Sequence, residues 1–481
     1  MYHSHASRLF ACCLLASVAA VCSFALLGRA EPPKEAASER SVYHADPQHL
    51  WNRLHQALFV RVGPDGRLYG QDRLEPLLWP QSKHLLEERS HKRAVALLEE
   101  FLKDKGENLI EDPLKRAVFQ RDLWLVFNWL EGDHASFAAP PLKTEEVSAA
   151  QERLRRPLAA VIGRLALTPE QIKKLPDNYA AAVASGEFAK QFEPERPDRP
   201  FLPDLFAVDG PWVCVGRPDG PVAPEHLEER GNNVFTNSAF LVFLRLPAGR
   251  ATTLDYLKRL RSFDQPLLVK TDDGYRKYLP NPKLPQPPVG TEVALVRRAL
   301  LIDSSHKILP TALTESVQLR VYREVPDMTV QTLNAALVGG TAAYRRAHSW
   351  QSFQEFRLNR SLLFADRAGG LRPVGVEERD FETGFGSHTW DEFEFRGYRP
   401  ADRSFAEASQ GLIREKCFAC HSLPGVSSFN SFFHYRAHLL DSDGQRPFSL
   451  SVAPVSEVAG AAVKWKERRP NWTALRKLLA E

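Results

Sequence analysis

The sequence predicts a multidomain α+β protein, and three observations lead to this prediction. The chain has 481 residues, which is too long for a single compact core. Apolar residues recur with helical spacing over 46–190 and with strand-like spacing over 206–400, and a proline-rich stretch separates the two ranges. Helical spacing returns within 401–481. We therefore expect an N-terminal helical domain over 46–190, a central mixed α/β or β-rich domain over 206–400, and a C-terminal all-α domain over 401–481.

The composition narrows the class of protein. Hydrophobic residues make up 43% of the chain and charged residues 25%, as in ordinary globular proteins, so disorder is excluded for most of the chain. Lys and Arg number 63 against 59 Asp and Glu, which gives a net charge of +4. A dedicated nucleic-acid-binding protein would carry a larger basic excess, so we expect no nucleic-acid partner.

The N-terminus is predicted to carry an export signal. Arg8 precedes an almost wholly apolar run over 9–27, and a small-residue site ends at Ala30. This order is typical of a secretory signal peptide over 1–30, followed by a polar linker over 31–45. The run is long enough to serve instead as an uncleaved membrane anchor. Either reading places the body of the protein outside the cytoplasm, in the periplasm or cell envelope.

The N-terminal region is predicted to be helical from its start signals and its periodicity. A capping residue followed by proline marks a helix start at Asp46-Pro47, Asp112-Pro113 and Thr168-Pro169. Apolar spacing predicts another helix between His84 and Leu102. The aromatic residues Trp124, Phe127 and Trp129 are interpreted as helix-packing core.

The central region is predicted to contain buried strands, at 212–215, 240–244, 293–302 and 317–322, and a short helix over 252–263. In the last of these strands Val317, Leu319 and Val321 alternate with Gln318, Arg320 and Tyr322, which predicts one buried and one solvated face. Cys214 lies in an apolar strand context and is interpreted as a small buried hydrophobe.

One short sequence motif, at residues 417–421, indicates a specific chemical function. Residues 417–421 read Cys-Phe-Ala-Cys-His, the C-x-x-C-H sequence that attaches c-type haem. Two thiols three residues apart can reach the two vinyl groups of one haem, and the following histidine can bind the iron. The segment resembles the c-type cytochrome family. The resemblance implies one haem c bound through Cys417 and Cys420, His421 as the proximal iron ligand, and an all-α, cytochrome c-like mono-haem domain.

The sixth iron ligand is not given by the motif. Small cytochromes supply a methionine downstream, but this chain has only Met1 and Met328. His434 and His438 are candidates because they stand four residues apart, on one face of a predicted helix. Met328 or His388 from the preceding region is a further alternative, as is a five-coordinate iron with an open site.

These features favour one-electron transfer with a redox partner protein. The alternatives are a haem-dependent periplasmic enzyme or sensor with an open iron site, and a binding or scaffold protein stapled by zinc. Zinc would be held by Cys417, Cys420, His421 and a fourth group such as Cys214. No catalytic residue is assigned, although 388–392 holds side chains suited to acid/base work. A basic cluster, Lys466, Arg468 and Arg469, is a candidate docking site for an acidic redox partner.

Overall fold

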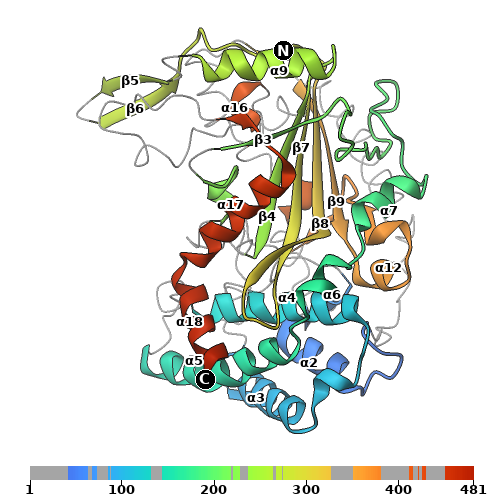
Figure 1. Cartoon of the computed structure of the whole chain (residues 1–481), viewed down its shortest axis with the longest axis vertical. Helices are drawn as coiled ribbons and strands as arrows, with labels where there is room; N and C mark the ends of the chain where they lie inside the picture. Colours follow the sequence, from blue (N-terminus) through green and yellow to red (C-terminus); the bar gives the residue numbers. More distant parts are fainter. Residues whose placement is uncertain are drawn as a thin grey trace, which may run out of the picture. The chain divides into compact units, whose positions relative to one another are not determined.

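A computed structural model shows an α+β fold with an antiparallel central sheet (Figure 1). It describes residues 42–62, 68–72, 85–86, 88–131, 144–217, 220–227, 237–263, 267–272, 275–326, 350–380, 411–414, 421, 425–429 and 450–481. All structural statements below concern these residues.

The N-terminal helices begin close to the capping residues in the sequence. Asp112 accepts a hydrogen bond from the Leu114 amide at 2.8 Å, and Thr168 forms a capping box with Gln171. The start predicted at Asp46 is displaced, because the helix begins at Leu50 and His49 caps it. The helices are α2 (Leu50–Phe59), α3 (Glu88–Lys103), α4 (Pro113–Leu130), α5 (Thr144–Arg164), α6 (Pro169–Lys173) and α7 (Asn178–Ala184).

The central sheet has the strand order β10-β9-β8-β7-β4-β3-β13, and every neighbouring pair is antiparallel. The apolar runs in the sequence correctly predicted its middle strands. The strands are β3 (Val213–Gly216), β4 (Ser238–Arg245), β7 (Glu292–Ile302), β8 (Ile308–Tyr322), β9 (Gln351–Leu358), β10 (Leu371–Pro373) and β13 (Ser451–Val452).

Shorter elements surround this sheet. The predicted helix over 252–263 is α9 (Arg250–Arg261). The remaining elements are the pairs β1 (Arg61–Val62) with β2 (Leu68–Tyr69), β5 (Leu267–Asp272) with β6 (Tyr275–Pro280), and β11 (Arg379–Asp380) with β12 (Gly411–Leu412), and the short helices η1 (Gly106–Asn108), α8 (Pro224–Leu227), α12 (Arg360–Phe364), η2 (Ala368–Gly370) and α16 (Val426–Phe429).

Both faces of the sheet are buried. Alternate residues of β4 point to opposite sides: Leu241 packs in a first core with the N-terminal helices, and Val242 packs in a second core with α9. The prediction that one face of β8 is solvated is therefore wrong, since Arg320 is only 3% exposed and Tyr322 is fully buried. Tyr322 belongs to the second core.

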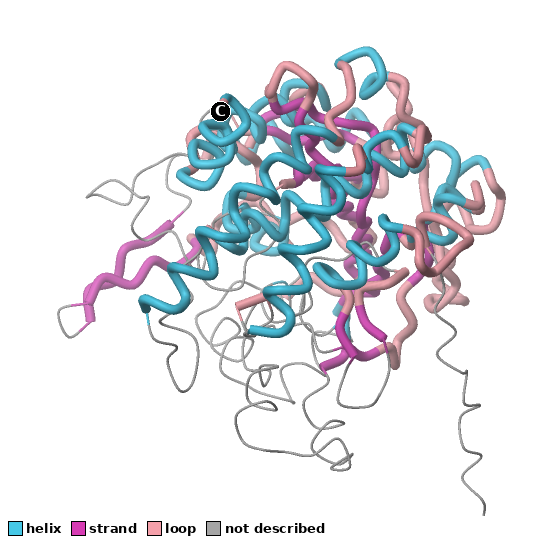
Figure 2. Tube along the Cα trace, turned by 90° about the horizontal axis from the view of Figure 1, so that it is seen from below, coloured by secondary structure: helices cyan, strands magenta, loops and turns pink. Residues whose placement is uncertain are grey.

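The C-terminal region adds a strand and two helices to this arrangement. β13 pairs with β3, and α17 (Val455–Glu467) then contacts β4 and β8 (Figure 1). α18 (Pro470–Ala480) follows and packs on α5, so the C-terminus lies among helices (Figure 2). The described part of 401–481 therefore differs from the all-α expectation, because β12 and β13 are strands and β13 extends the central sheet.

A buried network of charged side chains joins the N-terminal helices to the sheet. Arg360 binds Asp122 with its Nη2 at 2.6 Å from Oδ2, and neither side chain is more than 1% exposed. Tyr43 donates to the same carboxylate oxygen at 3.2 Å. Arg121 bridges Asp122, at 3.0 Å, to Glu315 of β8. Because each buried carboxylate has cationic and hydroxyl partners, the cost of removing it from water is offset.

Candidate cofactor-attachment site

Of the residues predicted to bind the haem or its iron, the structure describes one. His421 is buried, with 9% of its surface exposed. The other candidates lie outside the described residues: Cys417, Cys420, His434, His438, Met328 and His388. The neighbourhood of His421 therefore defines the geometry of the predicted site in the described residues.

Side chains from two adjacent strands hold the main chain around His421. Gln351 of β9 donates from Nε2 to the His421 carbonyl oxygen at 2.6 Å. Tyr322 of β8 lies directly opposite Gln351 in the sheet register, and its hydroxyl donates to the Gly425 carbonyl oxygen at 3.2 Å. Because directly opposed residues share one face of a sheet, both anchors hold the chain on the side of the second core.

A third contact fixes the turn that follows. The Val426 amide donates to Oε1 of Gln286 at 3.1 Å. Gly425 has φ +93°, and a Cβ atom at this position would lie 2.5 Å from Gln286 Oε1. Glycine is therefore favoured here both by the backbone conformation and by the close approach of Gln286.

Apolar burial completes the attachment of this part of the chain. Val426 and Phe429 of α16 are buried in the second core, and the Phe429 ring lies edge-on to Tyr256 of α9 at 6.4 Å. Burial raises the pKa of the Tyr256 phenol well above 10, so the phenol stays neutral and donates to the Pro285 carbonyl oxygen at 2.9 Å. Residue 421 and residues 425–429, called the His421 segment below, are thus anchored on an apolar, aromatic surface.

A second histidine lies beside His421. The ring of His226, in α8, is centred 6.0 Å from the His421 ring, and the two ring planes differ by 2°. The His226 ring also stacks on the ring of Phe240 in β4, with 5.0 Å between the ring centres. No local pattern predicts this neighbour, since His226 precedes β4 and stands at no fixed spacing from the C-x-x-C-H motif.

Cys214 lies on the opposite side of the sheet. It pairs with Phe243 and packs against the first core, whereas Phe240 beneath His226 belongs to the second core. Burial raises the pKa of the Cys214 thiol to about 12, so the thiolate needed to bind zinc is disfavoured. Cys214 therefore does not fit as a fourth zinc ligand with His421, and its interpretation as a buried apolar residue fits its surroundings.

The basic cluster near the C-terminus is not a fully exposed patch. Lys466 is only 2% exposed, donates to Oδ1 of Asn471 at 3.0 Å and lies 5.5 Å from the centre of the Trp124 ring. The Arg469 guanidinium lies over the Trp465 ring at 3.8 Å. The prediction that Lys466 is available to an acidic partner is therefore wrong, and Arg468 is the exposed cation of the three.

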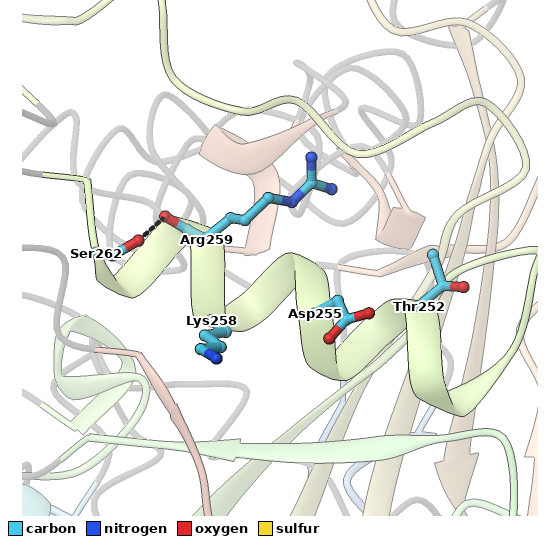
Figure 3. A pocket seen from close by; sticks show the side chains of 5 residues that line it. All are labelled: Thr252, Asp255, Lys258, Arg259 and Ser262. Atoms are coloured by element: carbon cyan, nitrogen blue, oxygen red, sulfur yellow. Dashed lines mark hydrogen bonds between the residues drawn. The ribbon is translucent and has the colours of Figure 1, made fainter.

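One hollow in the described part of the chain lies away from His421. A hollow of about 510 Å³ borders α9, lined by Thr252, Asp255, Lys258, Arg259 and Ser262. These side chains come from one helix, and Arg259 and Lys258 point in opposite directions, so they do not converge on a ligand (Figure 3).

Two properties of the described ranges bear on metal binding and on membrane crossing. Within them, three or more His, Cys, Asp or Glu side chains nowhere gather as a metal-binding group. No helix in these ranges is long and apolar enough to cross a membrane, and the predicted signal peptide or anchor lies outside them.

Comparisons of the chain with protein-family models, with curated proteins and with solved structures find no match. Its function is therefore inferred from its own residues.

Proposed function

We propose that this protein is an exported mono-haem c-type cytochrome-like protein that transfers one electron at a time to and from a redox partner protein. Cys417 and Cys420 would bind the haem through thioethers, and His421 would be the proximal iron ligand. The observation that carries the proposal is the Cys-Phe-Ala-Cys-His sequence over 417–421, and the signal peptide predicted over 1–30 agrees with it.

The surroundings of His421 fit such a group. Imidazole is a common ligand of iron, and His421 is buried beside the aromatic second core. An apolar surface limits the access of water to a haem and thereby tunes its reduction potential. When bound, the haem supplies a one-electron iron couple; the chain supplies burial, ligation and orientation.

The contacts around His421 account for its orientation. Gln351 and Tyr322 bind main-chain oxygens of the His421 segment, and Gln286 binds a main-chain amide. Because these contacts hold the backbone at residues 421, 425 and 426, they fix the position from which the imidazole projects. Such outer contacts orient metal ligands in general.

Electron transfer is favoured over a zinc staple by the position of Cys214. A structural zinc site needs four ligands, and Cys214, the fourth ligand suggested by the sequence, lies on the other face of the sheet.

The test is expression of the full chain with a c-type cytochrome maturation system, followed by a haem stain on a denaturing gel. We expect a covalent haem band in the wild type that is lost in Cys417→Ala/Cys420→Ala. Cys214→Ala is the matched control and should keep the band. A wild-type protein without covalent haem, with one equivalent of zinc in metal analysis, would overturn the proposal.

A further inference from the structure

The rings of His226 and His421 lie parallel, at a spacing compatible with one metal ion bound between them. Their ring centres are 6.0 Å apart and their planes are parallel within 2°. Two metal–imidazole bonds of about 2 Å each, plus about 1 Å from each ligating nitrogen to its ring centre, give a separation of about 6 Å. The observed distance therefore matches the space that a single bound metal ion requires.

We propose that His226 is the sixth ligand of the haem iron, so that the iron is bound by two histidines. This inference rests on the proposed function, because it requires the haem attached at Cys417 and Cys420. It replaces the ligands suggested by the sequence, His434 and His438, with a residue from the central region of the chain.

The surroundings of His226 support a fixed ligand. Its ring stacks on Phe240, a residue of the second core that is only 5% exposed. Phe240 lies in β4, which is hydrogen-bonded to β3 on one side and to β7 on the other. The stacking contact thus limits rotation of the imidazole and holds it on the same side of the sheet as His421. A ligand held in this way loses little conformational freedom on binding.

The chemical consequence is a closed iron site. Two imidazole ligands give a six-coordinate, low-spin iron, with no position left for a small molecule. Replacing methionine by histidine as the axial ligand lowers the reduction potential, because methionine raises it. His226 would thus favour a carrier of electrons at low potential over a sensor or an enzyme with an open site.

The test compares variants of the full chain, each produced with its haem. Wild-type protein should show a low-spin ferric and ferrous spectrum and should not bind carbon monoxide. His226→Ala should keep the covalent haem band but become high-spin and bind carbon monoxide, and added imidazole should restore the low-spin spectrum. His226→Met should remain low-spin with a higher reduction potential. His306→Ala, at a histidine in the β7–β8 turn, is the matched control and should resemble the wild type.

The outcomes separate this inference from the proposed function. A covalent haem that stays low-spin in His226→Ala, with the low-spin spectrum lost instead in His434→Ala or His438→Ala, overturns the assignment of His226 and leaves the cytochrome function standing. A wild-type protein whose covalent haem is high-spin also overturns it. A wild-type protein without covalent haem overturns both. Circular dichroism of each variant shows that the change in spin state does not come from unfolding.

Discussion

Polar groups are buried on both faces of the central sheet, but in different ways. On the side of the first core, Arg121, Asp122, Glu315 and Arg360 are ionised side chains that bind one another. On the side of the second core, neutral side chains such as Gln351 and Tyr322 bind main-chain atoms of the His421 segment. In the first arrangement, ion pairs join helices to strands. The second holds the main chain of the His421 segment in place through neutral side chains.

The largest effect is expected in the charged network. Arg360→Ala leaves Asp122 buried without its main cation, which should lower the free energy of unfolding by about 3–5 kcal/mol. Arg156, which pairs with Glu481 at the surface, is the matched control, and Arg156→Ala should cost at most about 1 kcal/mol. Denaturant unfolding of the two variants measures both values. Equal losses would show that the network is no more stabilising than a surface pair.

His55 borders this network, with its Nε2 3.9 Å from Asp122 Oδ2, and should make stability depend on pH. Burial, together with the charge of Arg360, lowers the pKa of His55 well below its ordinary value of 6.5. Above pH 6.5 His55 is neutral in both states and has no effect. Below pH 6.5 the unfolded chain binds a proton that the folded protein does not, so the free energy of unfolding should fall by up to about 1.4 kcal/mol per pH unit.

His55→Gln is the comparison for this pH effect. Glutamine does not titrate, so the difference in the free energy of unfolding between the variant and the wild type should change between pH 6.5 and 5 and stay constant above pH 7.5. Denaturant unfolding at several pH values gives this difference. A difference that is independent of pH would mean that folded His55 binds its proton as readily as in the unfolded chain.

A smaller loss of stability is expected when one buried hydroxyl is removed on either face of the sheet. Tyr322→Phe and Tyr179→Phe each remove a buried hydroxyl that donates to a carbonyl oxygen, of Gly425 and of Pro203 respectively. Each should cost about 0.5–1.5 kcal/mol. Amide hydrogen exchange should accelerate at residues 425–429 in Tyr322→Phe and not in Tyr179→Phe. The same exchange pattern in both variants would argue against a separate anchoring role for Tyr322.

The sequence predicted the elements whose determinants are local. Asp112 and Thr168 mark helix starts by their own hydrogen bonds, and the apolar runs in β4 and β7 predict strands by composition. β9 was missed because its polar residues suggest a surface, yet all of them are buried. Gln354, for example, is satisfied by main-chain groups of residues 197, 199 and 201 that no local pattern predicts.

The site shows the same division. The C-x-x-C-H motif is local, so its spacing alone singles out Cys417, Cys420 and His421, and the roles of all three remain predictions. The buried face of β8 could not be found, because Arg320 and Tyr322 look solvated until the other parts of the second core cover them. His226 lies beside His421 because of the folding of the sheet, and no sequence spacing links the two. The histidines nearer in sequence, His434 and His438, were therefore predicted instead.

The edge strand β13 has a consequence for the order of folding. β12 and β13 flank the His421 segment in the chain, and β13 pairs with β3, joining Ser451 to Gly216. Contacts between residues so distant in sequence form late, because the chain between them must first be ordered. The pairing of β13 with β3, which attaches the chain after the His421 segment, therefore depends on residues near the end of the chain. If the chain is exported N-terminus first and binds haem as proposed, residues 417–421 leave the channel before β13 can pair with β3, which leaves time for attachment of the haem.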